Sequence, residues 1–167
     1  MKKMFLFLLL TWGIMNANAQ YTLQPNSEKT TLDSLTTALN KLQRDFAYLD
    51  CYNKLKICTL EIDVFNKGLD ISSNSILINI YNTGFDQDLY DAYQENYNVS
   101  LEWYEAKRKA VSDVKTLATL MLFTKNFTEV ESDIINNLCN LLDTSLEKTK
   151  AGLRFYSVVL KNYKDKY

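Results

Sequence analysis

Residues that break helices are scarce in this chain. It has one proline, Pro25, and four glycines among its 167 residues. Proline and glycine are the residues that most often interrupt helices and form turns. Segments that lack them can continue as helices over many turns. Long helices are therefore the first structural expectation for this chain.

Mostly apolar residues recur at spacings of three, four or seven, which places them on one side of an α-helix. The first row is Leu32, Leu35, Leu39, Leu42, Phe46 and Leu49. The second is Tyr90, Tyr93, Tyr97, Leu101, Tyr104, Val111, Val114, Ala118 and Met121. The last is Ile135, Leu138, Leu142, Leu146, Thr149, Leu153, Tyr156, Leu160 and Tyr163. Each row predicts a long helix that packs in a bundle or coiled coil.

Capping residues predict where these helices begin. Ser27 is placed to cap the first helix and Asp86 the second, because their side chains can accept hydrogen bonds from free backbone N–H groups. The second helix should run to about Lys125. Thr128 and Glu131 form a T-x-x-E capping box, in which each side chain satisfies the other residue's backbone N–H. This box predicts the start of the last helix.

Residues 69–83 are harder to interpret. Lys67-Gly68 predicts the end of the first helix, because glycine readily adopts the left-handed conformation that follows a helix. The run at residues 76–81 is strand-like in propensity, but no second strand follows with which it could pair. We therefore expect a short helix that ends at Thr83-Gly84. A strand or an interaction edge is the alternative.

The predicted fold is all-α, an elongated antiparallel bundle of three long helices plus one short helix. It forms a single domain over residues 28–163, which is long enough to bury a core. Residues 20–27 are expected to be a flexible lead-in, and residues 164–167 a frayed tail.

The N-terminal sequence MKKMFLFLLLTWGIMNANAQ has the features of a cleaved signal peptide. Two lysines precede an apolar run that is shorter than the roughly 20 residues needed to span a bilayer. The ANA at residues 17–19 is a small-x-small cleavage site. We expect residues 1–19 to be removed and the product to be periplasmic or extracellular, without stable membrane insertion. Residues 33–35 (DSL) match an acceptor pattern for bacterial O-glycosylation. The sequence does not decide whether Ser34 is glycosylated.

Composition argues against several functional classes. The chain has no histidine and a net charge of −1. It therefore lacks the commonest general base and metal ligand, and it lacks the basic surface that nucleic-acid binding needs. Glu102 and Glu105 stand about one helical turn apart, but a glycoside hydrolase needs a cleft, which a helical rod does not offer. We expect no enzymatic activity, no cofactor and no metal, and a hydrolase ranks last among the alternatives.

The three cysteines, Cys51, Cys58 and Cys139, are the clearest chemical groups. Cys51 and Cys58 would stand about 10.5 Å apart along one helix, beyond the roughly 4.4–6.8 Å that a disulfide spans. If the first and last helices began at the same height, Cys139 would lie opposite Ala38, roughly 20 Å from Cys51. Free thiols, a Cys51–Cys139 disulfide and an intermolecular bridge remain open, whereas a zinc site is not expected.

The aromatic row of the second helix is a candidate contact surface. It comprises Tyr90, Tyr93, Tyr97, Trp103 and Tyr104. Such rings offer a flat apolar face and a polar tip to a sugar or a peptide. Their spacing is also that of a core row whose hydroxyl groups reach solvent at its edges, and this second interpretation is favoured.

The start of the last predicted helix, with Phe127, Thr128 and Glu131, resembles a late segment of exported, minor-pilin-like helical components of conjugative type IV secretion systems. The resemblance covers the signal and residues 86–160. It implies a structural or contact role at the cell envelope and brings no catalytic residues. We therefore expect a secreted or periplasmic, non-enzymatic protein that acts through protein–protein contacts, with homo-oligomers allowed. The alternative is a periplasmic helical chaperone or inhibitor.

Overall fold

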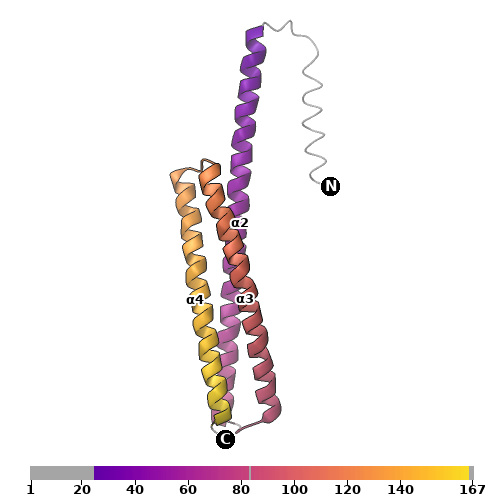
Figure 1. The fold of residues 1–167 in the computed structure, drawn as a ribbon, viewed down its shortest axis with the longest axis vertical. Coiled ribbons are helices and arrows are strands. Elements are labelled where there is room, and N and C mark those ends of the chain that lie inside the picture. Colours follow the sequence, from indigo (N-terminus) through magenta and orange to yellow (C-terminus); the bar gives the residue numbers. More distant parts are fainter. Residues whose placement is uncertain (1–24, 83, 166–167) are drawn as a thin grey trace. The chain divides into compact units, whose positions relative to one another are not determined.

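The computed structural model describes residues 25–82 and 84–165. Over these residues the chain forms three long helices and no strand: α2 (Pro25–Asn82), α3 (Gln87–Thr124) and α4 (Glu129–Asp165) (Figure 1). The prediction of an all-α fold with three long helices is confirmed. The expected signal peptide and most of the lead-in lie outside the described residues, as do Thr83 and the end of the tail.

The chain divides into two compact units between Leu42 and Gln43. In the first unit the structure describes the helical residues 25–42. Every residue of the first predicted row is half or more exposed, those in the first unit (Leu32, Leu35, Leu39, Leu42) and those in the second (Phe46, Leu49). None of these six side chains belongs to the buried core, so the packing predicted for this row in the core of a bundle is not observed.

The second unit is an antiparallel bundle formed by residues 43–82 of α2 together with α3 and α4 (Figure 1). At one end Nη2 of Arg44 lies 3.3 Å from Oε1 of Glu131, in the first turn of α4. At the other end the Tyr163 hydroxyl donates to the Gly84 carbonyl (3.3 Å) and accepts from the Asp86 N–H (3.1 Å). These contacts hold the start of α4 level with Arg44 and its end level with the α2–α3 loop.

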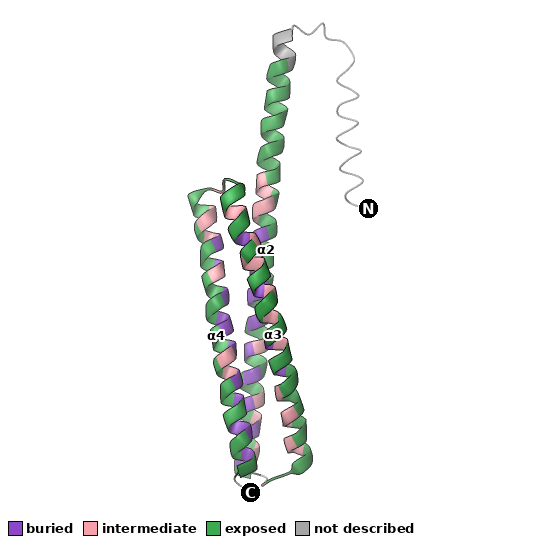
Figure 2. Cartoon of the chain, viewed as in Figure 1, coloured by how far each residue is buried: buried purple, intermediate pink, exposed green. Residues whose placement is uncertain are grey.

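Buried side chains form one core between the three helices of this unit (Figure 2). Every residue of the predicted α4 row is buried, which confirms that row. The α3 row is confirmed in part, because Leu101 is exposed and the neighbouring Ser100 is buried instead. From α2 the core takes a row that begins with Cys51 and Leu55. It continues with Cys58, Ile62, Leu69, Ile76 and Ile80.

The predicted break at Lys67-Gly68 is wrong, because α2 continues through it to Asn82. The expected short helix over residues 69–83 is thus the last part of α2. A glycine within a helix costs about 1 kcal/mol relative to alanine. Leu69 and Ile76, which follow, are almost fully buried, and each such burial contributes about 1.5–3 kcal/mol. Packing therefore outweighs the local preference for a break.

The predicted caps of α3 and α4 are confirmed. The Asp86 carboxylate accepts from the Leu89 N–H at 3.1 Å. The Glu131 carboxylate accepts from the Thr128 N–H at 2.8 Å, and the Thr128 hydroxyl accepts from the Glu131 N–H at 3.3 Å. For α2 the structure differs from the prediction, because the helix begins at Pro25. Proline suits the first helical turn, so Ser27 lies inside the helix rather than at its cap.

Candidate contact surface

The tyrosines of the candidate aromatic surface pack between α3 and α4. The ring of Tyr97 stacks on Tyr156 with centroids 5.7 Å apart, and Tyr93 meets Tyr163 edge-on at 6.3 Å. Tyr90 also lies against Tyr163, at 6.4 Å. Tyr104, the last tyrosine of the row, is buried. Their apolar faces are thus occupied within the bundle.

Hydroxyl groups of these tyrosines tie the helices together. The Tyr156 hydroxyl donates to the backbone carbonyl of Tyr93 at 3.1 Å, which joins α4 to α3. The Asn79 amide donates to the Tyr93 hydroxyl at 2.5 Å, which joins α2 to α3. Burial raises the pKa of the Tyr156 hydroxyl, so this group stays protonated and can donate. The contacts that the structure gives these tyrosines are those of a core row.

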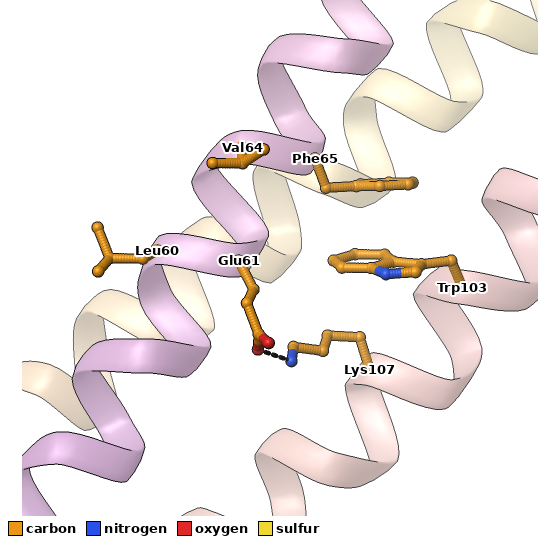
Figure 3. Close-up of a pocket in the computed structure, with 6 residues that line it drawn as sticks. All are labelled: Leu60, Glu61, Val64, Phe65, Trp103 and Lys107. Carbon is orange, nitrogen blue, oxygen red and sulfur yellow. Dashed lines mark hydrogen bonds and ion pairs between the residues drawn. The ribbon is translucent and has the colours of Figure 1, made fainter.

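Trp103 is the member of the aromatic set that borders an open depression. Its indole stacks on Phe65 of α2 with ring centroids 3.8 Å apart and an interplanar angle of 12° (Figure 3). The depression has a volume of about 430 Å³ and is lined mainly by apolar side chains from α2 and α3. Lys107 lies 6.0 Å from the Trp103 ring centroid and pairs with Glu61, which closes the depression on one side.

A second apolar row runs along the exposed side of α2 in the second unit, and the sequence analysis missed it. We call it the α2 stripe: Ile57, Leu60, Val64, Ile71, Ile78 and Tyr81. These side chains are between 55% and 80% exposed. Leu60 and Val64 also line the Trp103 depression, so the two features are continuous. The signal that could have revealed the stripe is the recurrence of β-branched residues every seven positions from Ile57 to Ile78.

The α2 helix therefore carries two apolar faces over the same residues. One face is buried in the core and includes Leu55, Ile62 and Ile76. The other is the α2 stripe, which α3 and α4 leave exposed. A helix that meets water on one side normally carries polar residues there. An exposed apolar row of this length is a feature of surfaces that contact another molecule.

The cysteines face the core rather than the α2 stripe, with Cys51 and Cys58 in it and Cys139 packed against it. All three are free, with Cys51 and Cys58 buried and Cys139 partly buried. Burial and, to a smaller extent, the nearby Cys139 raise the pKa of the Cys51 thiol to about 11. The expected height of Cys139, opposite Ala38, is wrong because α4 begins level with Arg44 and not with Ser27. Cys139 is consequently a neighbour of Cys51.

Carboxylates on the described residues do not assemble into a site. Glu102 and Glu105 are both exposed on α3, and Glu105 faces Arg108 at 3.8 Å. No cluster of three or more potential metal ligands occurs within residues 25–82 and 84–165. In the same part of the chain every buried side-chain nitrogen or oxygen has a hydrogen-bond partner. The buried amide of Asn66, for example, donates to the Ser145 carbonyl at 3.3 Å.

Comparisons with known proteins place no constraint on this surface. No protein-family model, curated protein or solved structure matches the chain. Among the described helices, none combines the length and apolar character needed to cross a bilayer.

Proposed function

We propose that this is an exported, non-enzymatic helical protein that acts through protein–protein contacts at the cell envelope. The observation that carries the proposal is the α2 stripe. Six large apolar side chains, all more than half exposed, follow one face of a helix whose opposite face is already buried. Leaving such a row in water costs roughly 25 cal/mol for each Å² that a partner could cover. A protein contact on this face removes that cost.

The first unit supports the same role independently. Leu32, Leu35, Leu39 and Leu42 are exposed there at the spacing of a coiled-coil seam. The signal-peptide form of the N-terminal sequence supports a location of these surfaces outside the cytoplasm. The resemblance of the α4 start to components of conjugative secretion systems suggests such an apparatus as the setting.

The Trp103 depression favours the second candidate, a helical chaperone or inhibitor. Its lining of Leu60, Val64, Phe65 and Trp103 is apolar and open to solvent. An extended or helical client segment could place one apolar side chain there. A chaperone would retain unfolded clients of many sequences, whereas a component of an apparatus would retain one partner.

A photoreactive amino acid at Val64 tests the proposal in the cells that make the protein. Val158 on α4 provides the matched control, because it is an apolar residue of similar type and is 56% exposed. We expect a discrete protein adduct at Val64 and none at Val158. A ladder of many adducts at Val64 would favour the chaperone. Absence of any adduct at Val64, with normal accumulation of the protein, would contradict a contact role for the stripe.

A further inference from the structure

The α2 stripe has the pattern of one strand of a two-stranded coiled coil. We propose that a second copy of this chain covers it, with the two α2 helices parallel and in register. This proposal rests on the contact function proposed above and names the partner. In heptad notation the a positions are Ile57, Val64, Ile71 and Ile78, and the d positions are Leu60, Lys67, Asn74 and Tyr81. All eight are exposed.

The a positions select a small, parallel assembly. All four are β-branched, and in a parallel coiled coil β-branched residues at a, with Leu at d as at Leu60, favour two strands over three or four. A strict repeat of seven also drifts by about 20° per heptad on a straight helix. Two copies that wrap around each other with a left-handed twist remove this drift and keep the row in contact.

The extent of the row suits a stable dimer. From Ile57 to Tyr81 it covers about 36 Å at 1.5 Å per residue. Six apolar side chains on each copy, all more than half exposed, would place the buried area on the order of 1,200 Å², which is the lower end of the range for specific interfaces. The Trp103 depression beside Leu60 and Val64 provides further apolar surface at the edge.

The two polar d positions set the register. In the parallel, in-register arrangement Asn74 faces the second copy's Asn74, so the two side-chain amides can bond each other. The antiparallel arrangement with the same overlap would place Asn74 against Val64, with no polar partner. A single polar residue in a coiled-coil seam is known to fix register in this way at a cost in stability. Lys67 lies one turn from Asp63 and from Asp70, and its stem can cover the seam while its ammonium group reaches water.

Charges beside the seam favour the same arrangement. Parallel pairing brings Lys56, at a g position, next to the second copy's Glu61, at the following e position, where Glu61 also pairs with Lys107 of its own chain. The two-fold symmetry forms this attractive pair twice. The antiparallel arrangement would instead bring Asp70 of the two copies together, and like charges at that distance repel. Asn74 and these flanking charges therefore favour the parallel dimer.

Sedimentation equilibrium of the purified full chain, from about 1 to 100 µM, tests the proposal. We expect a monomer–dimer equilibrium. Ile71→Lys should raise the dissociation constant by roughly 100-fold or more, because each copy loses the burial of one isoleucine. Val158→Lys, on the exposed side of α4, should leave it unchanged. Helical content by circular dichroism shows whether each variant is folded.

The orientation has its own test, which keeps Asn74 in place. Tyr81→Cys, at a d position, should form a symmetric disulfide between copies under mild oxidation, and Ser157→Cys on α4 should not. A monomer at every concentration, a trimer, or equal weakening by both lysine substitutions would overturn the proposal. So would a dimer in which Tyr81→Cys alone fails to cross-link while its mixture with Ile57→Cys does. If the purified chain is monomeric but Val64 forms an adduct with another protein in cells, the second copy is excluded and the contact function survives.

Discussion

Phe65 of α2 and Trp103 of α3 stack with their ring centroids 3.8 Å apart and their planes 12° from parallel. The pair joins the two helices at the surface, beside the α2 stripe, while the core joins them inside. Stacked aromatic pairs contribute about 0.5–1.5 kcal/mol beyond the area that they bury. This stack is thus part of both the stability of the bundle and the shape of its candidate contact surface.

Replacing Trp103 by alanine should destabilise the bundle by about 2 kcal/mol, because the ring is partly buried and loses both its packing and its stack. Urea unfolding followed by circular dichroism measures this. Phe123→Ala is the matched control, since Phe123 is also on α3 and is 83% exposed. Its effect should stay within about 0.5 kcal/mol. Equal effects of the two substitutions would show that the stack does not form.

Gly68→Ala should stabilise the protein by about 0.5–1 kcal/mol. Gly68 lies within α2, and a Cβ atom there would meet nothing within 4 Å. Alanine therefore keeps the helical conformation and reduces the freedom of the unfolded chain. Thermal unfolding gives the sign directly. A lower melting temperature would indicate that Gly68 ends a helix in a left-handed conformation, as the sequence alone suggests. Gly84→Ala is the informative contrast. Gly84 has φ = 73°, a backbone conformation that alanine adopts at a cost, so this substitution should destabilise the protein.

The pKa of the Cys51 thiol predicts an alkaline loss of stability. This pKa is about 11 in the folded chain, raised from its usual value of 9.0 chiefly by burial. A raised pKa of this kind stabilises the fold below about pH 9, and the contribution is lost as the pH rises towards 11. The difference in unfolding free energy between the wild type and Cys51→Ala should therefore shrink over that window. The difference for Leu55→Ala, which removes a buried and non-titrating neighbour, should not change.

Glu131 predicts an opposite dependence in acid. Its pKa is lowered chiefly by the hydrogen bond from the Thr128 N–H. A lowered pKa stabilises the fold above the unfolded value, near 4.5, and this contribution is lost as the pH falls through the folded pKa. Glu131→Gln should be less stable than the wild type at neutral pH, and the gap should narrow in acid. Glu129 lies in the same first turn of α4. If the stability difference between Glu129→Gln and the wild type also narrowed as the pH falls, a specific capping role for Glu131 would be contradicted.

The last helix could be predicted almost completely from the sequence, and the first only in part. In α4 the row from Ile135 to Tyr163 is the one long apolar row, and all of it is buried. In α2 two apolar faces share the same residues, and periodicity does not say which of them the other helices cover. Ile62 is buried and Val64 is exposed for a reason that lies in α3 and α4. Tertiary packing also overrides the local preference of Gly68 to end a helix.

The proximity of Cys139 to Cys51 could not be predicted for the same reason, because it depends on contacts between residues far apart in the sequence. Capping patterns gave the first residues of α3 and α4, but not how α4 aligns with α2. That alignment depends on pairs such as Arg44 with Glu131, which are 87 residues apart in sequence. The assumption that the first and last helices begin at the same height therefore placed Cys139 far from Cys51.

The most direct test of the central claim, that the α2 stripe is a contact surface for a second copy, is carbene footprinting at increasing protein concentration. The account predicts that labelling of Val64 and Ile71 falls as the concentration rises, because these side chains become buried in the dimer. Labelling of Val158, which is exposed to a similar degree on α4, should stay constant. If labelling of Val64 and Ile71 stayed constant over a range of protein concentration in which the chain dimerises, the interface would lie elsewhere and the account would be contradicted.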